Sequence, residues 1–265
     1  IVVGAKTNPN HRVGLDLRLQ SAVTVIFEDS KGNIWFGTEH DGPCMFDGKV
    51  YTYFTRYDPS LYSAVLAILE DKNGTIWVRT KNTLSRLDGE VLENVSLKDA
   101  QNRDEDWQIT PDNLWFTAGG FGHVYSLEGE KISLLTIPKP DENAVDAQKS
   151  ASRFGVFSVL KAKNQTLWLG THGAGVVKFD GNEFTYINDK NLDFTVMSIF
   201  EDSKGNMWFG NDGAGVFLYT KNGFVNITAE HGLSDKTILL THRISNQAKT
   251  LARVWAIEED AEGNM

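Results

Sequence analysis

One short segment decides the fold: residues 27–38 read FEDSKGNIWFGT, and residues 200–211 repeat it almost letter for letter as FEDSKGNMWFGN. Two further copies lie between them, LEDKNGTIWVRT at residues 69–80 and LKAKNQTLWLGT at residues 160–171, with a shorter relative, PDNLWFT, at residues 111–117. Self-similarity of this kind is the mark of a repeat architecture. The chain is therefore expected to consist of several copies of one structural unit.

Each copy carries a tryptophan that acts as its anchor. These tryptophans are Trp35, Trp77, Trp115, Trp168 and Trp208. Successive anchors are 42, 38, 53 and 40 residues apart. These spacings lie near the period of about 40 to 45 residues that is typical of the four-stranded blade of a β-propeller. The spacing therefore favours an all-β propeller over a sandwich or a helical fold.

The residues of the first complete unit predict four antiparallel strands. Residues 23–27 are apolar and β-branched, residues 29–33 form a turn whose glycine can adopt a positive φ, and residues 34–37 return as the second strand. A glycine-rich loop leads to a third strand at residues 44–46 and a half-exposed outer strand at residues 49–54.

The length and the repeats together predict a six-bladed propeller that forms a single domain over residues 1–265. The sixth blade would be shared between residues 252–265, which restart the repeat, and residues 1–6, which resemble its second strand. Such closure pairs the edge strands of a ring. The alternative is a fragment cut inside a longer repeat array.

Composition excludes several classes of protein. The formal net charge is −9, which argues against a nucleic-acid partner and against docking on an anionic membrane surface. One cysteine, Cys44, rules out an internal disulfide framework and a cysteine-based zinc site. The sequence contains no apolar run of about 18 residues, so no membrane segment is predicted.

At residues 28–38 the chain resembles the two-component regulator propeller repeat, whose pattern is Glu-Asp-x-x-Gly-Asn-Ile/Leu-Trp-Phe/Ile-Gly-Thr. The match is strong around Trp35, Trp168 and Trp208, fair around Trp77 and weak around Trp115. The resemblance implies a periplasmic or secreted bacterial location. It also implies the sensor role that is common in that family. The family's propellers are often glycan-responsive parts of membrane histidine kinases, so a parent protein would carry a signalling domain.

A weaker resemblance runs to the streptogramin-lyase propellers, which are metal-assisted enzymes with a His/Glu site on the propeller axis. The chain also departs from the regulator pattern at Arg79, which replaces the repeat's glycine and is followed by a shortened loop.

The recurring residues themselves are interpreted as structural. The Glu-Asp pairs recur at the same hairpin, so they are expected to cap turn amides rather than to act as an acid/base pair. The tryptophans are expected to pack between blades, and the Gly-Ala-Gly runs at residues 173–175 and 213–215 lack the strand-to-helix setting of a phosphate loop.

A site is expected on the loops at one end of the blades, after each second strand and between blades. Polar residues that interrupt the repeat gather in these loops. The predicted ligand-binding residues are His40, Asp41, Arg79, His123, His172, Asp212 and His231. Candidate catalytic residues are His172, Asp212 and Glu39, and candidate ligands of a divalent metal are His40 and His172; no other cofactor is expected.

The leading functional hypothesis is a sensor-type propeller that binds a glycan or another polar small molecule over its central channel. The alternative is a hydrolase or lyase acting on a carbohydrate or polar substrate, with loop histidines and carboxylates as acid/base groups or metal ligands. A protein-interaction platform is the third reading, and it would require an exposed apolar patch.

Overall fold

The computed structural model describes most of the repeat units. The described residues are 11–12, 21–54, 61, 63–89, 91–97, 100–102, 107–118, 122–138, 154–172, 174–187, 195–230, 252–254, 257, 259–260 and 263–265. The chain divides into two compact units, Ile1–Ala100 and Gln101–Met265, which are described separately.

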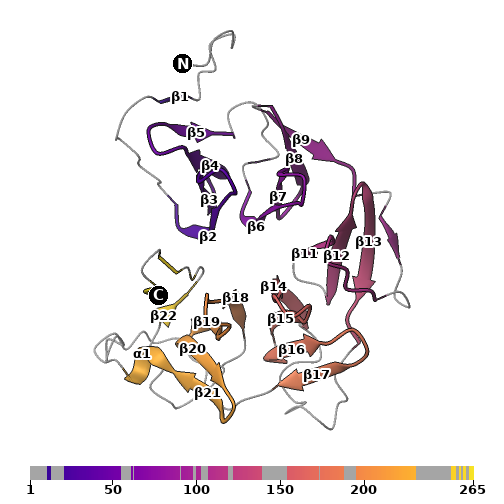
Figure 1. Cartoon of the computed structure of the whole chain (residues 1–265), viewed down its shortest axis with the longest axis vertical. Helices are drawn as coiled ribbons and strands as arrows, with labels where there is room; N and C mark the ends of the chain where they lie inside the picture. Colours follow the sequence, from indigo (N-terminus) through magenta and orange to yellow (C-terminus); the bar gives the residue numbers. More distant parts are fainter. Residues whose placement is uncertain are drawn as a thin grey trace. The chain divides into compact units, whose positions relative to one another are not determined.

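The first unit contains two antiparallel sheets of the expected four-stranded kind (Figure 1). Their strands are β2 (Val23–Glu28), β3 (Ile34–Thr38), β4 (Pro43–Phe46) and β5 (Tyr51–Tyr53), then β6 (Val65–Glu70), β7 (Ile76–Thr80), β8 (Leu84–Asp88) and β9 (Val91–Val95). A short β1 (His11–Arg12) adds to the outer edge of the first sheet by pairing with β5.

The second unit contains three sheets and one helix of a single turn (Figure 1). Its elements are β10 (Gln101–Asn102), β11 (Leu114–Thr117), β12 (His123–Glu128), β13 (Lys131–Thr136), β14 (Gly155–Lys161), β15 (Leu167–His172), β16 (Val176–Phe179), β17 (Phe184–Ile187), β18 (Val196–Glu201), β19 (Met207–Gly213), β20 (Gly215–Thr220), β21 (Gly223–Asn226), α1 (Ile227–Glu230) and β22 (Ala252–Arg253). The fourth and fifth sheets follow the expected order, whereas in the third sheet β10 runs parallel to β13 and the tryptophan strand β11 lies at the edge.

The sheets are the blades of an all-β propeller, but the described residues form five of them, and the prediction of six was wrong. Residues 1–6, which were to complete the sixth blade, lie outside the described residues. Residues 252–253 form only the two-residue strand β22, which pairs with β19 of the fifth sheet. A sheet needs several mutually bonded strands, and a two-residue strand adds to an existing sheet instead. The single-domain assignment stays a prediction.

The aspartate of each Glu-Asp pair closes its own hairpin turn. One carboxylate oxygen of Asp29 accepts hydrogen bonds from the backbone N–H groups of Lys31 and Asn33, at 3.0 and 2.8 Å. The other oxygen accepts from the Asn33 amide and from the indole N–H of Trp35, at 2.8 and 2.9 Å. Asp71 and Asp202 bind Trp77 and Trp208 in the same way. The turn and the anchor tryptophan are thus one hydrogen-bonded unit.

The glutamate of the pair closes the turn of the preceding sheet. Glu70 of the second sheet accepts hydrogen bonds from the backbone N–H and the hydroxyl of Ser30 in the first sheet, at 2.7 and 2.5 Å. Glu201 accepts from the backbone N–H of Lys163, and Glu259 accepts from Ser203. The carboxylate pairs are therefore structural, as the recurrence predicts.

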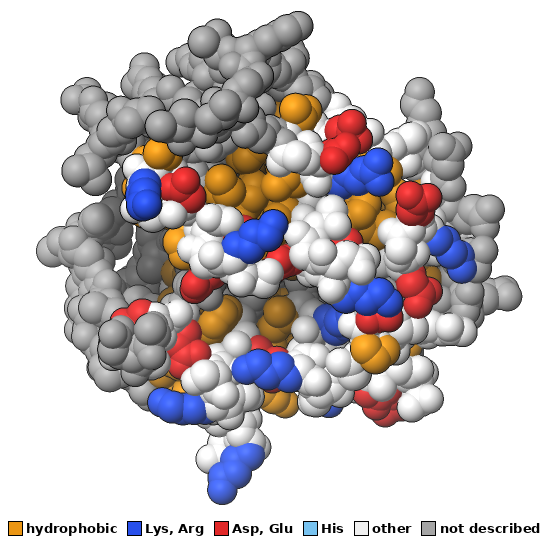
Figure 2. Space-filling model, turned by 45° about the horizontal axis from the view of Figure 1, so that its top comes forward, with side chains coloured by type: hydrophobic (Ala, Val, Ile, Leu, Met, Phe, Trp, Pro, Cys, Tyr) orange, Lys and Arg blue, Asp and Glu red, His pale blue; other side chains and the backbone are white. Residues whose placement is uncertain are grey.

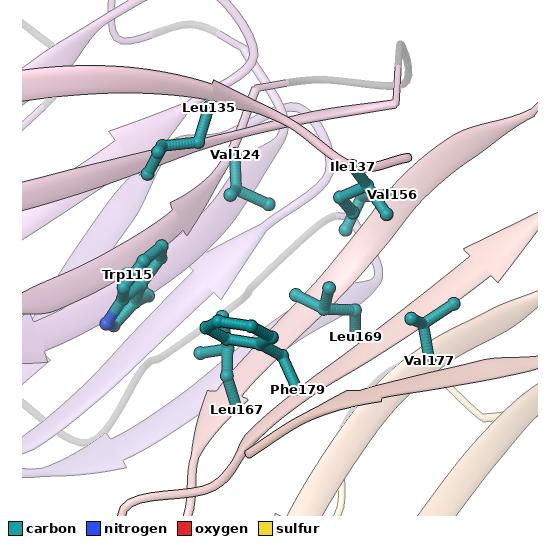
Figure 3. Close-up of a cluster of buried hydrophobic side chains, with 9 residues drawn as sticks. All are labelled: Trp115, Val124, Leu135, Ile137, Val156, Leu167, Leu169, Val177 and Phe179. Carbon is teal, nitrogen blue, oxygen red and sulfur yellow. The ribbon is translucent and has the colours of Figure 1, made fainter. Parts of the chain in front are cut away.

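The anchor tryptophans pack between neighbouring sheets. Trp35 is fully buried, in a cluster with Val65, Ile68 and Val78 of the second sheet. A corresponding cluster joins the third and fourth sheets, where Trp115 lies opposite Leu167 and Phe179 (Figure 3). The predicted role of the tryptophan row in packing is confirmed at these joints.

In the first and fourth sheets, a glycine two residues after the anchor tryptophan allows the next sheet to approach closely. A Cβ atom on Gly37 would lie 2.6 Å from Cγ1 of Val65, and one on Gly170 would lie 2.7 Å from the carbonyl oxygen of Val196. Real Cβ atoms do not make contacts this short. The spacing between consecutive blades therefore depends on the absence of a side chain at these positions.

Candidate functional site

Buried hydroxyl and amide groups hold the loops in which the sequence predicts a site. Thr38 is fully buried; its hydroxyl donates to the carbonyl of Gly42 at 2.9 Å and accepts from the backbone N–H of Asp41 at 2.8 Å. Thr171 makes the same two contacts with Gly175 and Ala174. The loops after the second strands are therefore structured turns, so their side chains have defined positions.

In the first unit, Glu39, His40 and Asp41 lie together on the turn that follows β3. The Asp41 carboxylate accepts hydrogen bonds from the backbone N–H and the hydroxyl of Ser21, at 3.0 and 2.8 Å. The His40 Nε2 atom lies 3.9 Å from Oε1 of Glu39, and 75% of the His40 side-chain surface is exposed. The structure thus brings these three predicted residues together, with His40 open to solvent.

Arg79 has a different environment from the other predicted residues. Its side chain is buried, and its Nη1 atom donates to the carbonyls of Thr80 and Thr83, the latter at 2.9 Å. The guanidinium therefore folds back on the shortened loop of its own sheet and stabilises that loop. A role for Arg79 in ligand binding stays a prediction.

In the second unit, Thr195 joins two of the three candidate catalytic residues, His172 and Asp212. Its hydroxyl forms a hydrogen bond with Nδ1 of His172, at the end of β15. Its backbone carbonyl accepts the N–H of Asp212, which lies near the end of the tryptophan strand β19 in the next sheet, at 3.0 Å. Asp212 is exposed and His172 is half-buried. Polar residues of consecutive blades thus meet at one point of the surface.

His123 has a different hydrogen-bonding partner from His172 and Asp212. It is the first residue of β12, and its Nδ1 atom lies 3.0 Å from the hydroxyl of Thr136 on the neighbouring strand. His231 lies outside the described residues. The role of the seven predicted residues in ligand binding therefore stays a prediction.

Sequence reasoning missed a second feature of this end of the blades, a β-bulge in the first strand of four sheets. The pairing between the first two strands shifts between Val156 and Ser158, and again between Val196 and Ser198. The residues skipped by the pairing are Phe157 and Met197, with Thr24 and Leu66 at the same place in the first unit. Bulges re-aim side chains and are common beside functional sites.

Phe157 is a bulge residue that lies beside one of the predicted site residues, His172. Its ring centroid is 6.2 Å from that of His172, and 37% of its surface is exposed. Hydrophobicity alone would assign this phenylalanine to the core. The exposure of Phe157 follows from the shift in strand register, which can be recognised only when the pairing of the two strands is known.

The described residues form no metal-binding cluster, and the face in Figure 2 carries charges of both signs. Among the described residues, no group of three or more His, Cys, Asp or Glu side chains is placed to hold a metal ion. On the face in Figure 2, Lys and Arg side chains lie next to Asp and Glu side chains. No helix within the described ranges is long and apolar enough to cross a membrane.

A family model described as the two component regulator propeller matches residues 18–40, 60–82 and 191–213. The three segments are two-component regulator propeller repeats. Each repeat runs through the first two strands of a sheet and into the loop where the site is predicted. The copy around Trp168 lies outside the matched segments, and there Ala162 and Gln165 replace the aspartate and glycine of the turn.

Solved structures with a similar fold include an extracellular domain of a two component system and a lyase. An extracellular domain of a hybrid two component system from B. thetaiotaomicron has a TM-score of 0.62 and 17% identity, over 91% of this chain and 32% of that one. A catalytically inactive virginiamycin B lyase from Staphylococcus aureus, with quinupristin, has a TM-score of 0.57 and 18% identity, over 80% and 73% of the two chains. A search of curated proteins finds no match. At these identities the similarity establishes the propeller fold.

Proposed function

We propose that this chain is a ligand-recognition module of an extracytoplasmic sensor and that it binds a glycan or another polar small molecule. The observation that carries the proposal is the contact of Thr195 with both His172 and Asp212. These bonds hold the imidazole of His172 and the backbone of Asp212, whose side chain is exposed, at one end of consecutive blades. Such convergent polar groups on a rigid scaffold are what recognition of a hydroxyl-rich ligand requires.

The regulator repeats support the sensor part of the proposal. The similar domain from B. thetaiotaomicron is extracellular and belongs to a hybrid two component system, and the present chain spans 32% of its length. By analogy, the chain would work outside the cytoplasm, within a parent that carries a signalling domain.

Calorimetric titration of the purified chain against a panel of hexasaccharides tests the proposal. We expect binding without turnover, and about tenfold weaker binding for His172→Ala and for Asp212→Asn. The first change removes a hydrogen-bonding ring, and the second replaces a charged acceptor by a neutral amide, which makes weaker hydrogen bonds. Glu183→Gln is the matched control, since Glu183 is exposed in the hairpin at the opposite end of the fourth sheet.

The same experiment separates the alternatives. Cleavage of an oligosaccharide that is lost in His172→Ala would establish the hydrolase or lyase reading instead. Metal-dependent cleavage would support the prediction that His40 and His172 are metal ligands. Absence of binding to every probe would reject the glycan form of the proposal.

A further inference from the structure

The bulge in the first strand of the fourth sheet places an aromatic ring beside the polar pair. Phe157 is skipped by the pairing of β14 with β15, whereas its neighbours Val156 and Ser158 pair with Thr171 and Gly170. Val156 is fully buried and Phe157 is 37% exposed. The bulge therefore directs one large apolar side chain towards solvent next to His172.

The polar residues near the Phe157 ring are His172, Thr195 and Asp212. The Phe157 and His172 rings are 6.2 Å apart at their centroids and inclined by 54°. The Thr195 hydroxyl is bonded to the His172 ring, so the ring beside Phe157 is held in place by a hydrogen bond, and the Thr195 carbonyl accepts the backbone N–H of Asp212. Met197, the bulge residue of the next sheet, adds a half-buried apolar side chain at the same strand position.

An exposed apolar residue alone would need no explanation. What distinguishes Phe157 is the combination of an exposed aromatic ring, a bulge that recurs at this strand position and a polar pair fixed next to it. Small-molecule sites commonly combine an apolar surface with a few placed polar groups.

We propose that Phe157 is a stacking subsite that makes this site select cyclic saccharides over open-chain polyols. The proposal rests on the proposed function and names the ligand class more narrowly. A pyranose ring has one face of C–H groups and an edge of hydroxyls. Its C–H face can lie on the phenyl ring while its hydroxyls reach towards His172 and Asp212, whereas a flexible open-chain polyol has no such face and loses more conformational freedom on binding.

The test compares ring and open-chain ligands on the intact chain. Cellohexaose, xylohexaose and sorbitol are titrated against the wild type and against Phe157→Ala, Phe157→Leu and Phe157→Tyr. We expect one of the hexasaccharides to bind the wild type and sorbitol to bind at least tenfold more weakly, with Phe157→Ala reducing saccharide affinity by about tenfold. Phe157→Tyr should stay within about twofold of the wild type because it keeps the ring.

Ile26→Ala is the matched control, because Ile26 has the same 37% exposure on the first strand of the first sheet but is not a bulge residue. Thermal unfolding of every variant checks that the fold is retained. If a saccharide binds and Phe157→Ala and Phe157→Leu bind it as well as the wild type, the stacking subsite is overturned and the proposed function stands. If sorbitol binds as tightly as the ring ligands, the selectivity is rejected. If no probe binds, both proposals fail for this ligand class.

Discussion

The ammonium group of Lys161 donates a hydrogen bond to the backbone carbonyl of Asn113, at 2.5 Å. It also donates to the carbonyls of Thr110 and Pro111, at 3.0 and 2.8 Å. Lys161 occupies the repeat position at which Glu70 and Glu201 accept hydrogen bonds from the preceding turn. At the joint between the third and fourth sheets, the later sheet therefore supplies the hydrogen-bond donor, whereas Glu70 and Glu201 supply the acceptor at theirs. This reversal fits a turn in which Pro111 has no backbone N–H to donate.

Replacing Lys161 by glutamate should destabilise the second unit strongly. The new carboxylate would face three carbonyl oxygens with no donor in return, and Lys161→Met, which only removes the donors, should cost about 2 kcal/mol. Urea unfolding measures both effects, and Lys161→Glu should be the worse of the two. Equal stability of Lys161→Glu and the wild type would contradict the conclusion that Lys161 stabilises this joint as a hydrogen-bond donor.

Replacing Gln165 by glycine should stabilise the protein. Gln165 has a φ of 62° at the turn position where Gly32, Gly74 and Gly205 also have positive φ. A side chain in this conformation costs about 1 kcal/mol, which is worth a rise in melting temperature of roughly 2–4 °C in a protein of this size. Gly205→Gln, the reverse change in the fifth sheet, should lower the melting temperature. A rise in both variants would show that φ does not control the effect.

Stability should fall when the solution becomes more acidic than about pH 4. Burial raises the pKa of Asp29, Asp71 and Asp202, but hydrogen bonds from the tryptophan indoles and turn amides outweigh it, so each pKa lies below the ordinary value of 3.8. A carboxyl whose pKa is lower in the folded state stabilises the fold above its unfolded value, and this contribution is lost as the pH falls through the folded value. Urea unfolding between pH 2 and pH 6 measures the loss, and Asp29→Asn should show a shallower dependence than the wild type.

The thiol of Cys44 should not react in the folded protein. The residue is buried, and burial raises its pKa to about 12, with a hydrogen bond from Tyr53 opposing the shift. Since the thiolate is the reactive form, an aromatic disulfide reagent at pH 8 should label the protein only after unfolding in urea. Rapid labelling without urea would show that β4 opens readily.

Replacing Thr195 by valine should weaken ligand binding while leaving the fold intact. Valine keeps the shape of the threonine and its backbone contact with Asp212 but removes the hydroxyl bonded to His172. We expect a severalfold loss of affinity for the saccharide that binds the wild type, smaller than the loss caused by His172→Ala. A Thr195→Val variant that binds as tightly as the wild type would show that the His172 ring is positioned by other contacts.

Most of the blade architecture could be predicted because it is encoded locally. The expected strands at residues 23–27, 34–37 and 44–46 correspond to β2, β3 and β4 within about one residue, since turn residues and apolar patterning mark their ends. The roles of the Glu-Asp pairs and the tryptophans followed from recurrence, because a residue that returns in every unit serves the unit.

The errors lie where structure depends on pairing between distant segments. The parallel strand β10 and the addition of β22 to the fifth sheet leave no local pattern in the chain. The exposure of Phe157 depends on a register shift, and the link from His172 to Asp212 runs through Thr195, which lies 23 residues beyond His172. Residue types indicated candidate polar groups, but not which of them share a hydrogen-bonding partner.

The bonds made by Glu70, Glu201 and Glu259 give the repeat array a direction. Each turn is completed by a carboxylate that follows it in the chain, 40 residues later for Ser30 and Glu70, 38 for Lys163 and Glu201, and 56 for Ser203 and Glu259. During synthesis, a blade therefore emerges with its turn amides uncovered and acquires its cap only when the following repeat has been made. Local unfolding should propagate towards the N-terminus. When one blade unfolds, the turn of the preceding blade loses its capping carboxylate, whereas the turn of the following blade keeps its cap.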